Sequence, residues 1–458
     1  MRKYLSATNT VLFLLCVMYL ITYIDRVNIS TAAGAMKGEL HLNNTELGFA
    51  FSAFAYPYAV FQIIGGWVGD RFGARLTLFA SGLIWASATI LTGLAGGFQS
   101  LVLYRVLLGF GEGATFPTAT RAMQSWTKPS NRGFAQGITH SFARFGNAAT
   151  PPIVAALILS LTWRGSFMVL GAVSLVWVLI WVWYFRDDPK DHPAITAEEL
   201  ATLPPRKPDA RVRVPWWRLA GRMWPVTFTY FCYGWALWLY LSWIPQFFLN
   251  NYKLDIKQSA IFAAGVFLAG VVGDTCGGVL SDTVLRRTKR VRLARLSILI
   301  IGFVGALGSL LPMLYVHEIN LVAISLSSGF FFAELVIGPM WSIPMDIAPK
   351  HSGAAAGMMN TGSAVAAIVS PPVAGYIIDL TGSWEMPFRV TIGLLALGAL
   401  SALAMRPEIP FEDDRAPSGG APGAFETACQ PVSHRGDRVV RSARICDGQS
   451  PFRRSVSH

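Results

Sequence analysis

Five ionisable side chains lie inside apolar segments of the first half of the chain, and their types are those of an ion-binding site. Asp25 and Arg26 share one segment, Arg105 and Glu112 share a second, and Arg144 lies in a third. An ionisable residue inside a membrane-spanning helix costs several kcal/mol unless it is paired, so each is a functional candidate by default. Two acids and three bases leave one net positive charge, which a bound anion would neutralise. The set therefore predicts an anionic ligand.

The spacing of these residues limits how they can pair. Arg105 and Glu112 are seven residues apart, which places them two turns apart on one helical face. The side chains of Asp25 and Arg26 point about 100° apart around the helix, so they cannot contact the same partner residue with the same geometry. We expect Asp25 to pair with Arg105 and Arg26 to face a cavity near Glu112. The alternative is a static set of ion pairs that only joins the two helices.

A site of this kind couples an anion to a proton. In the empty site, Glu112 ionises readily beside Arg26. A substrate carboxylate that binds Arg26 in a bidentate manner withdraws that stabilisation and adds a like charge. Protonation of Glu112 and binding of the anion then favour each other, which predicts proton symport of an organic anion.

Several other polar residues are candidates for the same cavity. Arg144 lies four residues after His140 on one helical face, and either helps to bind the anion or is a permanent partner of Glu112. His140 is a candidate substrate contact, with a satisfied structural histidine as the alternative. Tyr23 and Tyr233 are candidates for contacts with substrate hydroxyl groups. Glu334 has no assigned role, and Pro245 is a candidate gate hinge near the outer end of its helix.

Apolar helices must position these residues. The chain has 458 residues, of which 53% are hydrophobic and 14% are charged, against about 25% charged in soluble proteins. Continuous apolar runs of about 20 residues suffice to cross a bilayer core of about 30 Å, and they favour helices over an alternating β-barrel. We predict an all-α membrane protein with twelve transmembrane helices, at 10–32, 46–69, 76–97, 101–123, 133–160, 165–185, 223–247, 258–281, 293–315, 319–343, 352–379 and 386–405.

Lysine and arginine orient these helices. With the N-terminus inside, most basic residues fall in the inner loops, which predicts a multi-pass protein of the cell inner membrane with both termini cytoplasmic. The formal net charge of +12 therefore reflects the orientation of the helices in the membrane. We expect the protein to contact a lipid bilayer and not to bind nucleic acid.

Two halves of the chain repeat each other. Residues 132–152 match residues 352–372 at an offset of 220, and Glu112 precedes Pro117 by five residues, as Glu334 precedes Pro339. Parallel repeats of six helices are typical of two-lobed transporters. We predict two pseudo-symmetric bundles and two polar segments, at 1–185 (N-terminal bundle), 186–222 (cytoplasmic central loop), 223–411 (C-terminal bundle) and 412–458 (disordered cytoplasmic tail).

Enzyme classes find no support in the sequence. It contains no P-loop, nucleophile elbow or cluster of metal ligands, and the five cysteines form no CxxC pair. Asp25 and Glu112 resemble a catalytic acid pair, but their arginine neighbours favour transport. We therefore expect no cofactor and no metal, with a proton as the coupling ion.

The segment GGWVGDRFGAR (65–75) resembles the loop between the second and third helices of the major facilitator superfamily. The matching residues are Gly66, Asp70, Arg71, Gly73 and Arg75, with Ala74 where the family often has a basic residue, and Asp282 repeats the acidic position in the second half. The resemblance implies that these residues lie at the membrane surface and gate the carrier.

Two further segments, YIDRVNIS (23–30) and RVLLGFGEGATFP (105–117), are similar to the anion:cation symporter branch of that superfamily. The resemblance matches Arg26 to the anion-binding arginine, Asp25 to an acidic position that makes it a second protonation candidate, and Asn360 to a substrate-contacting position. An amide suits sugar hydroxyls, although Asn360 also fits helix packing beside Gly357. Members of the branch that carry glutamate, and organophosphate antiporters elsewhere in the superfamily, place a second arginine in the seventh helix. This chain has none between Met223 and Leu249, so the resemblance disfavours phosphate esters and amino acids.

The resemblance implies a monomeric, proton-coupled secondary transporter that imports a small organic anion by alternating access. A sugar acid (aldonate, aldarate or uronate) is the expected substrate, and an aromatic carboxylate is the alternative. A non-transporting nutrient sensor on the same fold is a further alternative, although neither the central loop nor the tail resembles a regulatory domain.

The role of Arg26 can be tested by the variant Arg26→Lys. We expect this variant to bind an organic anion poorly in a direct binding measurement, because a lysine ammonium lacks the planar fork of a guanidinium. Unchanged affinity would contradict a bidentate contact.

Overall fold

The computed structural model describes residues 6–128, 132–204, 215–349 and 352–411. In those residues the regular structure is helical. The helices are α1 (Ala7–Leu40), α2 (Asn44–Ala53), α3 (Ala55–Phe72), α4 (Ala74–Thr92), α5 (Phe98–Gly113), α6 (Thr115–Trp126), α7 (Arg132–Tyr184), α8 (Ala197–Thr202), α9 (Trp216–Asn251), α10 (Ile256–Thr288), α11 (Val291–Leu310), α12 (Ile319–Leu335), α13 (Ile337–Ile347), α14 (Ser352–Thr381) and α15 (Met386–Ala402), with 3-10 turns at Pro189–Asp191 and Pro312–Leu314.

These helices form the twelve predicted membrane spans. Three spans are broken into the pairs α2–α3, α5–α6 and α12–α13, whereas α7 contains two spans that meet at Thr162, where φ is 76°. Among the described residues, seven helical segments are long and apolar enough to cross a membrane by themselves, and α15 is a shorter apolar helix. The predicted tail 412–458 lies outside the described residues.

Proline explains the three breaks. Each break falls three residues before a proline, at Phe54 (Pro57), Ala114 (Pro117) and Val336 (Pro339). Because proline has no N–H, the carbonyl four residues earlier loses its helical partner and the helix weakens there. Two of these weak turns lie directly after Glu112 and Glu334, so the repeat seen in the sequence is also a repeat in backbone structure.

Pro245 does not act in this way. We expected it to break its helix near the end, but α9 continues without interruption from Trp216 to Asn251. A hydroxyl from the next helix contacts this turn, since Ser259 Oγ donates a hydrogen bond to the Pro245 carbonyl at 2.5 Å. The hinge prediction is therefore wrong for this conformation.

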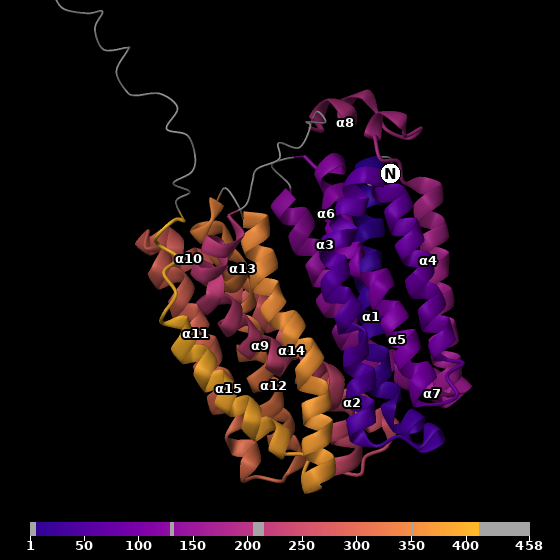
Figure 1. The fold of residues 1–458 in the computed structure, drawn as a ribbon, viewed down its shortest axis with the longest axis vertical. Coiled ribbons are helices and arrows are strands. Elements are labelled where there is room, and N and C mark those ends of the chain that lie inside the picture. The colour runs from indigo at the N-terminus through magenta and orange to yellow at the C-terminus, as the bar shows by residue number, and fades with distance from the viewer. Residues whose placement is uncertain (1–5, 129–131, 205–214, 350–351, 412–458) are drawn as a thin grey trace, which may run out of the picture. The chain divides into compact units, whose positions relative to one another are not determined.

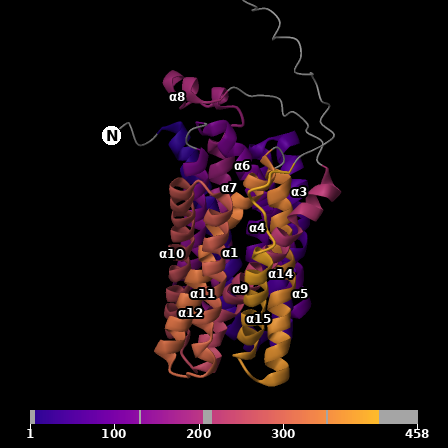
Figure 2. The same ribbon diagram turned by 90° about the vertical axis from the view of Figure 1, so that its left-hand side faces the viewer.

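The spans form two bundles that lie side by side, α1–α7 and α9–α15 (Figure 1). In Figure 2, turned by 90°, α10–α12, α14 and α15 lie in front of the first bundle. We name the two ends of this membrane body by their landmarks. The α8 end carries α8 and the start of α1, and the α2 end carries the start of α2 and the end of α14.

Hydrogen bonds tie the two bundles together at the α2 end. The Asp379 carboxylate, in the last turn of α14, accepts bonds from the backbone N–H groups of Asn44 (3.2 Å) and Thr45 (2.7 Å) at the start of α2. It also accepts from Asn44 Nδ2 (2.7 Å) and Thr45 Oγ1 (2.6 Å). A carboxylate at a helix N-terminus is stabilised by the free N–H groups and by the helix dipole. The described conformation is thus closed at the α2 end.

Close helix packing supports the same closure. A Cβ atom on Gly48 of α2 would lie 2.5 Å from the Pro371 carbonyl oxygen of α14, so only glycine allows this approach. Nearby, Gln246 Nε2 donates to the Ser30 carbonyl at 3.0 Å, and the rings of Phe51 and Trp243 pack edge to face.

Asp379→Asn should loosen this end of the molecule. Hydrogen bonds to a charged group contribute about 1.5–3 kcal/mol each, so we expect a cysteine placed at Ser30, in a background without native cysteines, to react at least about tenfold faster with a polar thiol reagent. Unchanged reactivity would contradict the closure.

Glu318→Gln is the matched control. The Glu318 carboxylate also accepts backbone N–H bonds at a helix start, from Asn320 (3.1 Å) and Leu321 (2.9 Å), and these bonds hold the pKa of Glu318 below its usual range. Its bonds stay within the second bundle, so this variant should leave the reactivity at Ser30 unchanged.

Candidate functional site

Arg26 and Glu112 form a buried ion pair in the first bundle. Arg26 lies in the middle of α1 and Glu112 in the last turn of α5, and Arg26 Nε lies 2.5 Å from Glu112 Oε2. Their side chains are 5% and 0% exposed. Among the described residues, Arg26 Nη2 and Glu112 Oε1 have no hydrogen-bond partner. The expected proximity is present, and the guanidinium keeps a donor for a ligand.

Four aromatic rings surround the Arg26 guanidinium. Its central carbon lies 4.6 Å from the ring centroid of Tyr58, 4.9 Å from Tyr23, 5.0 Å from Phe116 and 5.8 Å from Phe54. We call these four rings the aromatic cage. They attract a cation and exclude water, which strengthens the electrostatic interactions of the enclosed guanidinium. Sequence analysis identified Tyr23 but not the other three, because aromatic residues occur throughout these helices.

Asp25 and Arg105 do not form the ion pair that we expected. Asp25 points toward α7, where Ser174 Oγ donates to its Oδ2 at 2.9 Å, and its Oδ1 has no partner among the described residues. Arg105 Nε instead contacts the Ala50 carbonyl at 3.4 Å. The rotation of about 100° between adjacent helical residues explains this, because Arg26 faces Glu112 and so turns Asp25 away.

A small cavity is lined by Arg26 and Arg105. Its volume is about 10 Å³, and Ser242 and Trp238 of the second bundle complete its wall. This is room for about one water molecule. The space beside the two arginines is therefore nearly filled in this conformation.

Arg144 belongs to a second charged cluster, which joins the two bundles. Its Nε lies 3.1 Å from Asp274 Oδ2, and its Nη2 lies 3.4 Å from Glu334 Oε2. Tyr233 donates its hydroxyl to Glu334 Oε1 at 2.9 Å. The interpretation of Arg144 as a partner of Glu112 is therefore wrong, since its partners come from α10 and α12.

Asp274 was missed by the sequence analysis. The signal was available, because Asp274 is an acid inside the predicted helix 258–281. With it and Glu334 included, the charged groups near the middle of the membrane body are four acids and three bases: Asp25, Glu112, Asp274 and Glu334, against Arg26, Arg105 and Arg144. The first half alone has one net positive charge, but the seven residues together have one net negative charge when all are ionised. Net charge therefore does not favour an anion, and the evidence for anion binding is instead the Arg26 Nη2 group, which has no hydrogen-bond partner among the described residues.

Asn360 and His140 each contact another side chain of the bundles. Asn360 Nδ2 donates to Gln62 Oε1 at 3.2 Å, which links α14 to α3 across the two bundles. The His140 ring packs edge to face against Tyr19, with centroids 5.4 Å apart. Both residues therefore have contacts within the protein.

The residues of the loop motif lie at the α8 end. Gly73 has φ 85° between α3 and α4, and Arg75 donates through Nε and Nη2 to the Val182 carbonyl at 2.9 and 2.7 Å. Arg71 lies over the Trp67 ring at 5.6 Å. Gly66 and Asp70 lie in α3, and the Asp70 side chain is outside the described part of the chain.

In the second bundle, the repeated acidic position is tied to one arginine. Asp282 pairs with Arg295 at 3.2 Å, and Arg295 also pairs with Asp346 at 2.9 Å. These contacts stay within one bundle at the α8 end.

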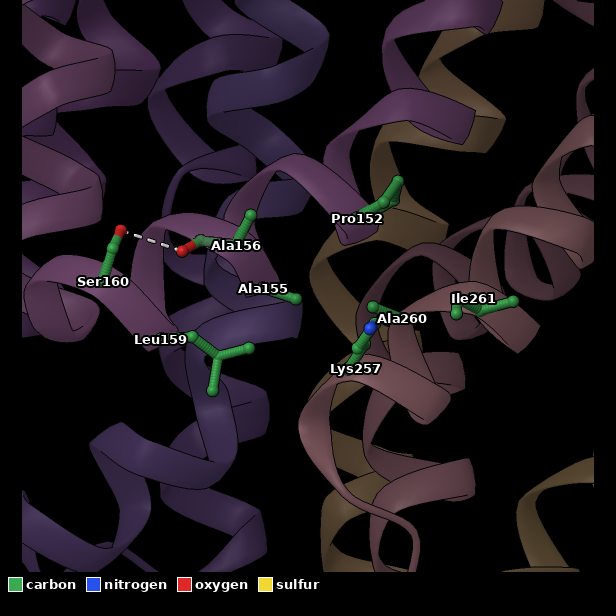
Figure 3. A pocket seen from close by; sticks show the side chains of 8 residues that line it. All are labelled: Pro152, Ala155, Ala156, Leu159, Ser160, Lys257, Ala260 and Ile261. Carbon is green, nitrogen blue, oxygen red and sulfur yellow. Dashed lines mark hydrogen bonds between the residues drawn. The ribbon is translucent and has the colours of Figure 1, made fainter.

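A larger cavity of about 500 Å³ lies between α7 and α10. Figure 3 shows its lining, which is apolar apart from Ser160 and Lys257. The charged clusters do not contribute to this wall. Its apolar character makes it a poor site for a small anion.

Comparison with known proteins places this geometry in context. The family model of the Major Facilitator Superfamily matches residues 15–370 and 292–446. The probable sulfoacetate transporter SauU of Cupriavidus necator is 48% identical over 411 residues, which cover 89% of this chain and 96% of that protein. The hexuronate transporter of Bacillus subtilis is 29% identical over 394 residues, covering 84% and 91%.

Among solved structures, a bacterial homologue of the human lysosomal transporter Spinster, in an inward-facing and unoccupied conformation, aligns with a TM-score of 0.71. The alignment covers 87% of this chain and 96% of that one at 17% identity. At this identity the match shows the fold alone.

The buried pair predicts a specific pattern of stability. Arg26→Leu leaves Glu112 buried without its partner and should destabilise the protein by about 3–5 kcal/mol. The double variant Arg26→Leu with Glu112→Leu should recover much of that loss. The control Arg292→Leu breaks an exposed pair with Glu408 and should change stability by less than about 1 kcal/mol. Thermal unfolding in detergent measures all three, and equal losses for the single and double variants would contradict the assignment.

Proposed function

The chain belongs to the Major Facilitator Superfamily, and from this premise we propose that it is a proton-coupled symporter that imports a small organic anion by alternating access. The chain is a multi-pass membrane transporter and not an enzyme. The observation that carries the proposal is the buried Arg26 guanidinium, which is held by Glu112 through one nitrogen and keeps Nη2 free.

The transport step follows from this geometry. An acid group of the substrate binds Arg26 through the free nitrogen and displaces the Glu112 carboxylate, which then takes a proton. The aromatic cage excludes water, so neither the anion nor an ionised Glu112 is stable there without the guanidinium. Asp25, with one carboxylate oxygen that accepts no hydrogen bond among the described residues, is the alternative acceptor of this same proton. Arg105 supports both acids electrostatically, since its buried guanidinium interacts with Glu112 and with Asp25.

Substrate size follows from the walls of the site. The rings of Tyr23, Phe54, Tyr58 and Phe116 leave few polar groups beside Arg26. A short anion such as sulfoacetate, the substrate named for the relative that is 48% identical, fits these walls better than a polyhydroxylated chain. A sugar acid stays the second candidate, with Asn360, His140, Arg144 and Tyr233 as its polar contacts, and an aromatic carboxylate is the third.

We assign the α8 end to the cytoplasm of a cell whose inner membrane holds the protein. Both termini are then cytoplasmic, and the described conformation, closed at the α2 end, exchanges substrate with the cytoplasm. Arg71, Arg75 and Asp282 act as the gate at the α8 end in the opposite state. The transporter works as a monomer, because each bundle pair contains a whole site.

Uptake into proteoliposomes tests the proposal. An inward proton gradient should drive accumulation of sulfoacetate by the native protein. Glu112→Gln should still exchange internal for external substrate but lose the accumulation that the Glu112 proton drives, because the amide cannot take up that proton. Glu408→Gln changes an exposed acid and serves as the matched control. Uptake indifferent to the gradient would contradict proton coupling, and binding without uptake would indicate a nutrient sensor.

A further inference from the structure

The molecule contains a second buried glutamate in the same structural position as Glu112. Both Glu112 and Glu334 lie two residues before a proline-weakened turn, and both side chains are buried, at 0% and 1% exposed. Each is paired with one arginine and keeps one oxygen without a hydrogen-bond partner among the described residues. The difference is that Glu334 takes its arginine, Arg144, from the other bundle.

The cluster around Arg144 holds more acid than base. Asp274 and Glu334 share one guanidinium, so one negative charge is in excess when all three groups are ionised. Of the two acids, Asp274 has a side chain that is 21% exposed, whereas the Glu334 side chain is buried. The Glu334 carboxylate lies 3.4 Å from the Arg144 guanidinium. That contact is too long for a strong hydrogen bond. A proton on Glu334 would therefore remove a buried charge that is poorly compensated.

The surroundings of Glu334 contain few other charged groups. Arg144 faces it from α7, Asp274 from α10 and the Tyr233 hydroxyl from α9. From α11, Gly302 and Gly305 pack against the neighbouring turns of α12. Protonation of Glu334 is thus set by Arg144, Asp274 and Tyr233.

Tyr23 connects this cluster to the Arg26 site. Its ring lies 4.9 Å from the Arg26 guanidinium carbon. A Cβ atom on Gly146 would lie 3.3 Å from the Tyr23 Cβ atom, and Gly146 is two residues from Arg144 in α7. This contact places α7 beside Tyr23, and the Arg144 guanidinium itself interacts electrostatically with the Tyr23 side chain.

We propose that Glu334 is a second proton-coupling residue and that Arg144 receives the second acid group of a two-headed anion whose first acid group binds Arg26. This inference rests on the proposed function and specifies its substrate class as short dianions. At each arginine, the substrate acid group replaces a protein carboxylate, and that carboxylate forms one O–H bond with a proton from solution. No other bond changes. A dianion thus enters with two protons and a monoanion with one.

The proton stoichiometry tests this inference without any variant. In proteoliposomes clamped at zero membrane potential, accumulation at equilibrium rises with the proton gradient raised to the number of coupled protons. For each tenfold proton gradient we expect sulfoacetate to accumulate about 100-fold and galactonate, which has one acid group, about tenfold. A slope of one proton for sulfoacetate would overturn the inference and leave proton symport intact.

Glu334→Gln then assigns the second proton. This variant should accumulate both substrates about tenfold per tenfold gradient, because only Glu112 is left to couple. Glu408→Gln, the exposed control, should keep the native difference, and two protons per sulfoacetate in Glu334→Gln would overturn the assignment. Uptake of galactonate without uptake of sulfoacetate or glucarate would also overturn it, whereas no gradient-driven uptake of any of these anions would reject the proposed function itself.

Discussion

The cost of placing charge in the middle of a membrane governs the structure. A guanidinium or carboxylate there must find a partner, because water is excluded and the uncompensated charge is unstable. Arg26 is satisfied by Glu112 within one bundle, and Arg144 is satisfied by Asp274 and Glu334 of the other. In both places the pairing is incomplete among the described residues, since Glu112 Oε1 and Glu334 Oε2 accept no hydrogen bond, and Glu334 Oε2 has only the longer contact to Arg144 at 3.4 Å. These incomplete pairs are where an anion and a proton can exchange places.

Each buried glutamate lies next to a weakened turn of its helix. Pro117 and Pro339 weaken the turns that follow Glu112 and Glu334, so each carboxylate lies beside a place where the helix bends at low cost. The two arginines also differ in where their partners lie, because Arg144 pairs with acids of the other bundle and Arg26 pairs within its own. A change in its pairing therefore alters the contact between bundles, whereas a change at Arg26 alters the site within one bundle.

Closure at the α2 end complements this arrangement. The Asp379 carboxylate uses the free N–H groups at the start of α2, and Gly48 lets α2 and α14 approach closely. The bonds are polar and few, so water can replace them when the bundles separate. A closure of this type is stable enough to seal one end and weak enough to open during transport.

Much of this protein was predictable from the sequence, because the membrane imposes strong and local rules. Apolar length predicted twelve spans, the repeat predicted two bundles, and adjacent helical positions predicted that Arg26 and Asp25 face different partners. Only the tertiary structure decided the partners themselves. Asp25 bonds Ser174, and Arg144 pairs with acids more than a hundred residues away. Helical period determines the face on which a side chain lies, but the helix that meets that face depends on how the bundles pack.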